Sequence, residues 1–296
     1  MSKISKLVII LTSAILTLLI ICSCVVFRYK IIYDFSNIKI KSDSLSGISV
    51  MTYNIKCNDR LDFSKSGWYY RAKYVAQNIQ ENLATIICFQ EVKIEQYDFL
   101  KNCLEEYESV ILFRDKTSLT EGTPIFYKSD CFDLVSFDSF WLSDTPTEMS
   151  NTWNGAYPRV CTSVVLKEKI TNKEFAVFNT HLDHLSQLAR INGLSLIKSK
   201  IESCKVPAII TGDMNSIPTS QVITTFKSDF DDLNDIWGWG ENEGTFKGGG
   251  ENANARIDYI FKSKNQFELV GYKIINKTFD GVNASDHFPI YAELKI

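Results

Sequence analysis

The sequence has 296 residues, 45% of them hydrophobic and 12% aromatic, enough to bury a core in one domain of about 250 residues after a short N-terminal segment. Four basic residues lie in or beside that segment, so the remainder carries 28 Lys and Arg against 35 Asp and Glu, a formal net charge of −7. No basic tract interrupts this balance, so the electrostatic footprint of a dedicated nucleic-acid-binding protein is missing. The six cysteines beyond the segment lack zinc-type spacing and are too sparse for a disulfide scaffold.

The N-terminal segment from Leu7 to Phe27 contains no charged residue. As a helix it would be about 31 Å long, enough to cross the hydrocarbon core of a bilayer. We therefore expect residues 1–27 to be a transmembrane signal anchor, since no small-residue cleavage site is evident. A bacterial lipoprotein signal with Cys24 as the lipidated residue is the alternative. Residues 28–46 are polar and read as a tether, and we expect the following domain to lie outside the cytoplasm.

Residues 47–296 are predicted to form one domain of short apolar strands and few helices. Apolar residues at helical spacing predict a helix over 68–83, and a second long helix runs over 187–204, ahead of a proline. A shorter helix is predicted over 95–106. Strands are predicted at 48–54, 86–89, 109–113, 124–127, 139–142, 160–166, 175–179, 208–211, 256–261, 269–275 and 288–294. Many strands with few helices in one domain favour two packed sheets flanked by helices.

Polar and charged residues follow the apolar runs of six strands, and these six segments contain all three histidines of the chain. The segments are Thr52–Asn54, Phe89–Glu91, Asn179–His184, Thr211–Asn215, Arg256–Tyr259 and Ser285–His287. Any one of them alone is most simply explained as turn or cap residues. Because strand ends in a sandwich converge on one rim, however, the six together predict a shared pocket.

Taken in order, the motifs TYN, QE, NTHL, GDMN, RIDYI and SDHFP resemble those of the endonuclease/exonuclease/phosphatase superfamily, the deoxyribonuclease I-like fold. The resemblance covers nearly all of residues 47–296. It is closer still to the bacterial membrane- or secretion-targeted branch, through Pro124–Tyr127, Pro158-Arg159 and the full NTHLDH. The resemblance implies an α+β fold, a four-layer α/β/β/α sandwich of two mainly antiparallel sheets flanked by helices.

The activity that the resemblance implies is metal-dependent hydrolysis of a phosphoester. A hard cation on the phosphate oxygens lowers the barrier to attack, and Mg²⁺ needs only one or two carboxylates to hold it. Glu91 is expected to be the main Mg²⁺ ligand, with Asn54 beside it and Asp286 at or near a second metal position. Mn²⁺ is a possible substitute.

Catalytic roles follow from the same resemblance. Asp213 would orient or deprotonate the attacking water, and Asn215 would hydrogen-bond the phosphate. His287 would contact the phosphate, polarised by Asp258 through its other ring nitrogen. An adjacent carboxylate favours the imidazolium form, whose charge suits the transition state. His181 would donate to another phosphate oxygen or assist the leaving group.

The substrate side of the site is less defined by the sequence. Arg159 is expected to be an auxiliary cation, and Asp183 and His184 are expected to lie at the substrate or just behind the residues that touch it. The resemblance implies a nucleic acid as one candidate substrate, and a lipid or small-molecule phosphoester of the sphingomyelin or phosphoinositide type as the alternative. A catalytically inactive binding protein on the same fold is disfavoured because every metal and base residue is present. We expect a monomer that contacts the membrane through residues 7–27, with no protein partner.

Overall fold

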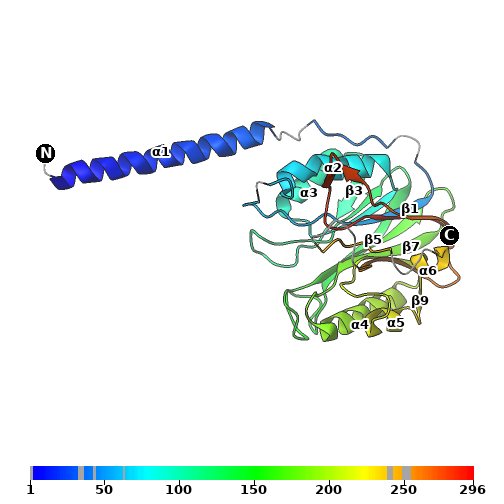
Figure 1. The fold of residues 1–296 in the computed structure, drawn as a ribbon. Helices are drawn as coiled ribbons and strands as arrows, with labels where there is room; N and C mark the ends of the chain where they lie inside the picture. The colour runs from blue at the N-terminus through cyan, green and yellow to red at the C-terminus, as the bar shows by residue number, and fades with distance from the viewer. Residues whose placement is uncertain (1–2, 33–36, 43–44, 63, 239–242, 249–254) are drawn as a thin grey trace. The chain divides into compact units, whose positions relative to one another are not determined.

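The computed structural model describes residues 3–32, 37–42, 45–62, 64–238, 243–248 and 255–296 (Figure 1). The chain divides into two compact units, Met1–Asn37 and Ile38–Ile296. The first unit contains the single helix α1 (Lys3–Ile32), and the remaining helices and strands belong to the second.

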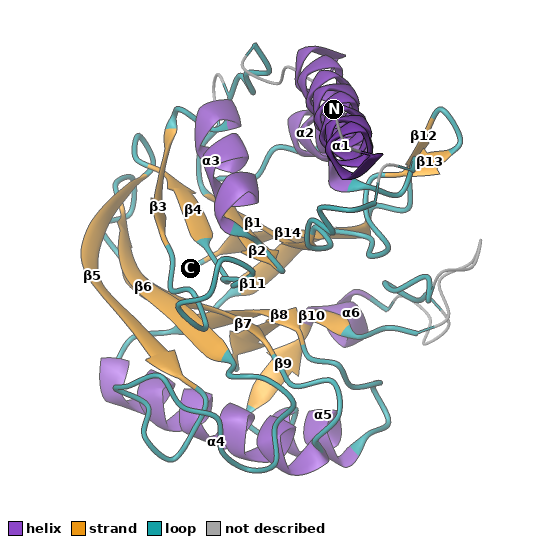
Figure 2. Cartoon of the chain, turned by 90° about the vertical axis from the view of Figure 1, so that its left-hand side faces the viewer, coloured by secondary structure: helices purple, strands orange, loops and turns teal. Residues whose placement is uncertain are grey.

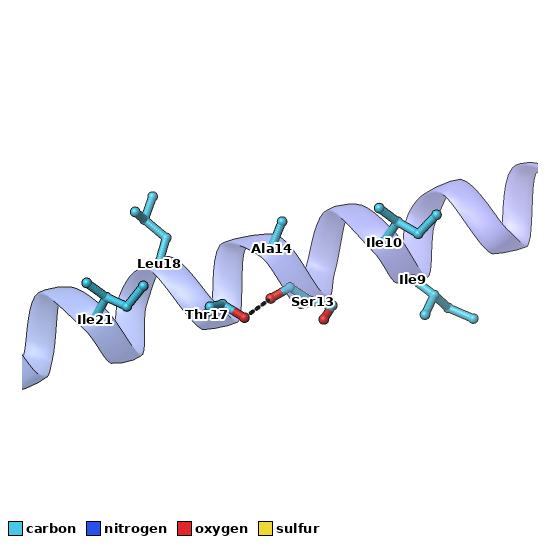
Figure 3. A pocket seen from close by; sticks show the side chains of 7 residues that line it. All are labelled: Ile9, Ile10, Ser13, Ala14, Thr17, Leu18 and Ile21. Atoms are coloured by element: carbon cyan, nitrogen blue, oxygen red, sulfur yellow. Dashed lines mark hydrogen bonds between the residues drawn. The ribbon is translucent and has the colours of Figure 1, made fainter.

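Most residues of helix α1 between Ile4 and Ser23 are apolar. The stretch Ile4–Ser23 has a mean hydropathy of 2.5, and none of it is buried. Figure 3 shows apolar side chains pointing outward from several sides of the helix, and Thr17 donating to the carbonyl of Ser13 at 2.9 Å. Because the Thr17 hydroxyl is hydrogen-bonded within the helix, its transfer into an apolar environment costs little free energy. By length and composition the helix suits a membrane span or a signal sequence.

The predicted tether of residues 28–46 includes the boundary between the two units. Helix α1 continues to Ile32, beyond the boundary predicted at residue 27. Ile40 is buried, and its backbone N–H donates to a carbonyl of the domain at 2.8 Å. The described part of the chain does not include residues 33–36 and 43–44. It also does not include the side chain of Cys24, the residue expected to be lipidated in the alternative reading.

The second unit contains two six-stranded sheets. Their strand orders are β11-β14-β1-β2-β4-β3 and β5-β6-β7-β8-β10-β9. The first sheet comprises β1 (Ile48–Asn54), β2 (Ile86–Gln90), β3 (Tyr107–Val110), β4 (Ile125–Lys128), β11 (Glu268–Ile274) and β14 (Ile290–Lys295). The second comprises β5 (Phe132–Trp141), β6 (Val160–Glu168), β7 (Glu174–His181), β8 (Ala208–Asp213), β9 (Phe230–Asp232) and β10 (Asp258–Ser263). A small hairpin adds β12 (Thr278–Phe279) and β13 (Val282–Asn283).

One pair of strands in each sheet is parallel, β1 with β2 and β7 with β8, and the other neighbours are antiparallel. Each parallel pair is connected by a helix, α2 (Trp68–Glu81) or α4 (Gln187–Cys204). Figure 2 shows α2 and α3 (Ile94–Cys103) covering the first sheet, and α4 and α5 (Gln221–Phe226) covering the second. The short α6 (Leu233–Trp237) packs near β9–β11. The predicted four-layer sandwich of mainly antiparallel sheets is therefore confirmed.

Burial on both faces explains why the central strands were visible in the sequence as continuous apolar runs. Every residue of β1, β2 and β8 is buried, because one face meets the other sheet and the other face meets a helix. Strand β5 lies at a sheet edge with most of its residues exposed. It has no apolar run, so only its end was predicted. The short elements α5, α6, β9, β12 and β13 were also not predicted from the sequence.

Candidate active site

The predicted polar segments meet at one end of the two sheets. Residues of five of these segments line a cavity of about 360 Å³. Asn54, from the sixth segment, donates hydrogen bonds to two of the lining residues, Glu91 and Asp213. The lining residues are Glu91, Arg114, Glu121, Tyr157, Arg159, His181, His184, Asp213, Asn215, Phe246, Ile257, Asp286 and His287.

Strand register places three of the predicted catalytic residues in one row. Asp213 at the end of β8 pairs with His181 of β7 on one side and with Asp258 of β10 on the other. The close approach of β7 and β8 depends on Gly212, which has φ +142°. A Cβ at this position would lie 1.9 Å from the carbonyl oxygen of Thr180. The backbone before Asp213 can therefore be formed only by glycine.

The carboxylate of Asp213 is buried at the centre of the site. Its Oδ2 accepts a hydrogen bond from Asn54 Nδ2 at 3.0 Å, and its Oδ1 accepts one from the backbone N–H of Asn215 at 2.9 Å. Burial, and then the nearby charge of Asp258, raise the pKa of Asp213 to about 7. A carboxylate with such a pKa can accept a proton near neutral pH.

The two histidines beside Asp213 are held in different charge states. His287 Nε2 lies 3.7 Å and His181 Nε2 lies 3.6 Å from Asp213 Oδ2. Burial opposes charge on His287, but Asp258 Oδ2, 2.8 Å from its Nδ1, raises the pKa to about 10. The pKa of His181 lies well below its usual value because of burial and the positive charge of Arg159. At neutral pH His287 is an imidazolium and His181 is neutral.

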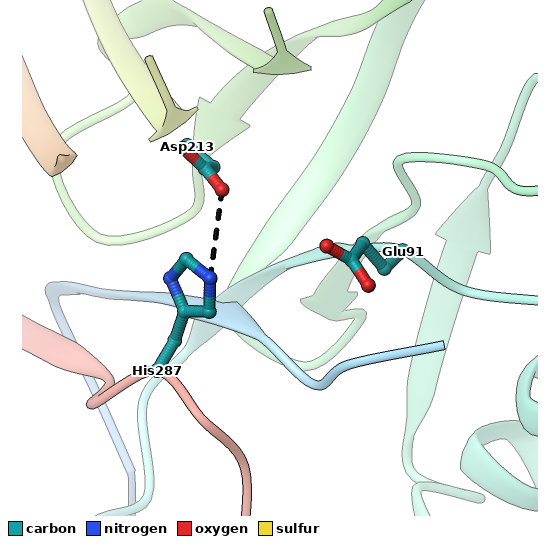
Figure 4. Close-up of side chains that lie close together, drawn as sticks. All are labelled: Glu91, Asp213 and His287. Carbon is teal, nitrogen blue, oxygen red and sulfur yellow. Dashed lines mark ion pairs between the residues drawn. The ribbon is translucent and has the colours of Figure 1, made fainter. Parts of the chain in front are cut away.

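Glu91 faces these groups from the other sheet. Ligand atoms of Glu91, Asp213 and His287 all lie within 4.8 Å of one another (Figure 4). The residue has φ +60°, a left-handed conformation that costs a non-glycine residue about 1–3 kcal/mol and is common at functional sites. Its Oε2 accepts a hydrogen bond from the backbone N–H of Cys57 at 2.9 Å. The position of Glu91 is thus fixed by the loop after β1.

Asn54 connects the carboxylates of the two sheets. Its Oδ1 accepts a hydrogen bond from the backbone N–H of Lys56 at 3.0 Å, which identifies the other amide atom as Nδ2. That Nδ2 donates to Glu91 Oε1 at 3.1 Å as well as to Asp213. In this geometry Asn54 orients the two carboxylates by donating to both, rather than presenting an oxygen to a cation.

Arg71 of α2 positions the loop that carries Asp286 and His287. Its guanidinium donates to the carbonyl of Ala284 at 2.6 Å and to that of Ile55 at 2.9 Å. The loop after β1 is in this way tied to the loop before β14. Asp286, predicted near a second metal position, lines the cavity with its side chain 31% exposed.

Comparison with known proteins identifies the architecture around this site. Residues 51–287 match the sequence model of the endonuclease/exonuclease/phosphatase family. The chain belongs to this family. A family member of known structure from Bacteroides thetaiotaomicron is 32% identical, with a TM-score of 0.77, covering 83% of this chain and 97% of that one. A mannosyl-6-phosphatase from the same organism is 30% identical, with a TM-score of 0.77, covering 84% and 100%.

Curated relatives of the family are more distant and longer. Nocturnin of Drosophila melanogaster is 27% identical over 174 residues, 53% of this chain and 26% of that protein. The Ccr4 3′-5′-exoribonuclease subunit of Mycosarcoma maydis is 24% identical over 315 residues, 77% and 46% respectively. The chain thus spans less than half the length of these two relatives. The relatives of this chain include both an exoribonuclease subunit and a phosphatase.

Cationic and aromatic side chains form a further wall of the cavity. Arg159 Nη2 lies 3.2 Å from Nδ1 of His184, whose ring stacks on Tyr157 at 6.0 Å. The guanidinium of Arg114 lies 4.7 Å from the centre of the Tyr157 ring and pairs with Glu121 at 2.8 Å. Burial raises the pKa of Glu121. This wall offers several hydrogen-bond donors to an anion in the cavity.

Sequence reasoning missed three residues of this wall. Glu121 and Tyr157 lie outside the predicted strand ends, on long connections between strands. Arg114 directly follows the predicted strand 109–113 but was not among the six chosen segments. No apolar run precedes Glu121 or Tyr157, so for these two residues the sequence carried no positional signal. Asp183, by contrast, is buried behind the wall, where its carboxylate accepts backbone hydrogen bonds from Ala156, Leu185 and Ser186.

Proposed function

We propose that this protein is a Mg²⁺-dependent hydrolase that cleaves a P–O bond by attack of water. The observation that carries the proposal is the convergence of Glu91, Asp213 and His287 within 4.8 Å, each from a different part of the chain. A base, an imidazolium and a second carboxylate in one cavity are the groups that hydrolysis of a phosphoester needs.

A divalent cation fits the donor set. The negative charge of Glu91 contributes to raising the pKa of Asp213. A bound cation would reduce this repulsion between the two carboxylates. Glu91 would hold the metal with Asp286 on the same cavity, and the oxygen donors suit Mg²⁺, with Mn²⁺ as a substitute. When bound, the metal would polarise a phosphate oxygen and stabilise its negative charge. Asn54 would contribute by orienting Glu91.

The protein's own residues would carry the proton transfers. A water oxygen attacks phosphorus while Asp213 takes its proton, and the P–O bond to the leaving group breaks. His287, kept protonated by Asp258, donates to a non-bridging oxygen on which negative charge accumulates. Neutral His181 donates a hydrogen bond to another phosphate oxygen or to the leaving oxygen, which ends protonated from solvent. Asn215 lines the same cavity and would hydrogen-bond the phosphate.

For the substrate we propose a compact phosphoester, the small-molecule alternative, in preference to a nucleic acid. A cavity of about 360 Å³ is in the range of small-molecule sites. Arg159, His184 and Tyr157 close one side of it, leaving less room for a duplex than an open groove would. The similarity to a mannosyl-6-phosphatase over 84% of this chain supports the same choice.

We also propose that α1 anchors the protein in a membrane with the domain outside the cytoplasm, as in the membrane- or secretion-targeted bacterial branch. The support is the length and apolar character of the Ile4–Ser23 stretch. Residues 7–27 would then be the membrane contact.

The activity is tested by hydrolysis of bis(p-nitrophenyl) phosphate, mannose 6-phosphate, sphingomyelin, phosphoinositides, plasmid DNA and RNA, each with Mg²⁺, with Mn²⁺ and with EDTA. We expect turnover of a small phosphoester with either metal and none with EDTA. Turnover that persists fully in EDTA would exclude the metal-dependent mechanism. Rapid cleavage of DNA or RNA, with the small phosphoesters inert, would overturn the substrate choice.

A further inference from the structure

A second cavity, of about 310 Å³, lies next to the first. Asp286 belongs to the walls of both. The second cavity is lined by Lys56, Lys65, Ser66, Arg71, Lys247, Gly281, Val282, Asn283, Ser285 and Asp286. None of these residues except Asp286 was expected to take part in catalysis or binding.

The charge of this cavity is opposite to that of the whole protein. Its lining has four basic side chains and one acidic side chain, whereas the chain has a formal net charge of −3. Lys56, Lys65 and Lys247 come from separate positions in the sequence and are brought together by folding. A concave site lined by one sign of charge concentrates the field and attracts ions of the opposite sign.

Lys56 is held in place by its backbone. It has φ +57°, a conformation that favours glycine or asparagine. Its N–H donates to Asn54 Oδ1 at 3.0 Å, and its carbonyl accepts from Arg71 Nη2 at 3.1 Å and from Gln96 Nε2 at 3.0 Å. The side chain leads from this fixed backbone towards the border of the two cavities, where Nζ lies 3.9 Å from Asp286 Oδ2.

Arg71 adds a further positive charge to the lining of the second cavity. The residue is buried, and the hydrogen bonds described for its guanidinium go to the backbone carbonyls of Ile55, Lys56, Ser66 and Ala284. These carbonyls satisfy its donors but carry no net charge, so the guanidinium charge is not cancelled by its hydrogen-bond partners. In a low-dielectric surrounding its field extends into the adjoining cavity.

We propose that the second cavity binds a second anionic group of the substrate, a phosphate, while the reacting phosphate lies between Asp213 and His287. The inference rests on the proposed function and narrows its substrate class to phosphoesters with a further phosphate. Lys56 and Lys65 supply ammonium donors, which bind phosphate as point charges. Such a phosphate could belong to a sugar bisphosphate or to a short oligonucleotide.

The experiment compares substrates that differ by one phosphate: fructose 1,6-bisphosphate with fructose 6-phosphate, and the dinucleotide pTpT with TpT. Binding by calorimetry and kcat/KM are measured for the full chain and for the double variant Lys56→Gln/Lys65→Gln. We expect the wild-type protein to favour the doubly phosphorylated member of one pair about tenfold, and the variant to lose this ratio. The pair that shows the preference identifies the source of the phosphate.

Lys264→Gln, at an exposed lysine on the β10–β11 turn, is the matched control and should keep the wild-type ratio. Equal binding of both members of each pair by the wild-type protein would overturn the inference. So would an unchanged ratio in the double variant. Absence of hydrolysis of all four compounds would count against the proposed function instead, because calorimetry reports on the cavity without turnover.

Discussion

The side chains of Asp258, His287 and Asp213 interact in that order. The charge of Asp258 raises the pKa of His287, and the charge of His287 lowers the pKa of Asp213. Asp258 Oδ2 contacts the histidine at 2.8 Å and also accepts a hydrogen bond from Thr245 Oγ1 at 2.6 Å. The histidine, in turn, lies 3.7 Å from the Asp213 carboxylate. Its charge partly offsets the burial of that carboxylate, which would otherwise have an even higher pKa.

Replacement of His287 by Asn should reduce kcat about 10²–10⁴-fold, because a proton donor to the phosphate is lost. Asp213→Ala should give a loss of similar size, because the base is removed. Steady-state kinetics with a phosphoester that the wild-type protein hydrolyses measure both effects, and circular dichroism establishes that the variants are folded. A folded His287→Asn protein with near-normal turnover would refute the assigned role.

The stability of the metal-free protein should fall as the pH rises from 6.5 to 10. The pKa of His287 is raised from 6.5 to about 10 in the folded protein, so its stabilisation is fully present below pH 6.5 and is lost as pH approaches 10. The slope from this one group is at most about 1.4 kcal/mol per pH unit. Urea unfolding in EDTA across this range measures it. His287→Asn should flatten the decline, and an equally steep decline in the variant would contradict the assignment.

At the scale of elements, the site depends on the two parallel strand pairs. Strands β1, β2, β7 and β8 each end at or just before a residue of the site, because a connecting helix makes both members of a pair run in the same direction. The sheets are also joined below the cavity. Asn179 of β7 accepts from Gln90 Nε2 of β2 at 2.7 Å and donates to the carbonyl of Phe89 at 2.8 Å.

The substitution Gly212→Ala should destabilise the protein by on the order of 3 kcal/mol or more, because the added Cβ would collide with the carbonyl of Thr180 in β7. Gly271→Ala in β11 is the matched control. Its Cβ would meet nothing nearer than 3.5 Å. Urea unfolding of both variants tests this contrast, and equal stabilities would show that β7 and β8 can separate without cost.

At the scale of the whole molecule, the core belongs to the second unit. The apolar residues between the sheets and those between the second sheet and its helices are drawn from the Ile38–Ile296 unit. Helix α1 buries none of its Ile4–Ser23 stretch. The free energy of unfolding of the domain should therefore be independent of α1.

Removal of residues 1–37 should leave a soluble domain with an unchanged thermal midpoint and unchanged kcat on a soluble substrate. The full chain should instead sediment with membranes and require detergent for extraction, because its apolar helix is otherwise exposed to water. Fractionation and thermal melts in the same detergent measure both properties. A truncated chain that fails to fold would contradict the division into two units.

The sequence by itself predicted the sandwich, the long helices and the residues that we propose to carry the chemistry. Buried strands such as β1 and β8 leave continuous apolar runs, and motifs such as GDMN and SDHFP are short and local, so both are readable without coordinates. Tertiary structure decided which charges meet. It brought Glu121 and Tyr157 to the cavity from loops that have no pattern, and it gathered Lys56, Lys65 and Lys247 into a basic pocket within an acidic chain. Electrostatic interactions depend on the distance between charges in space, and this distance cannot be read from the order of residues in the sequence.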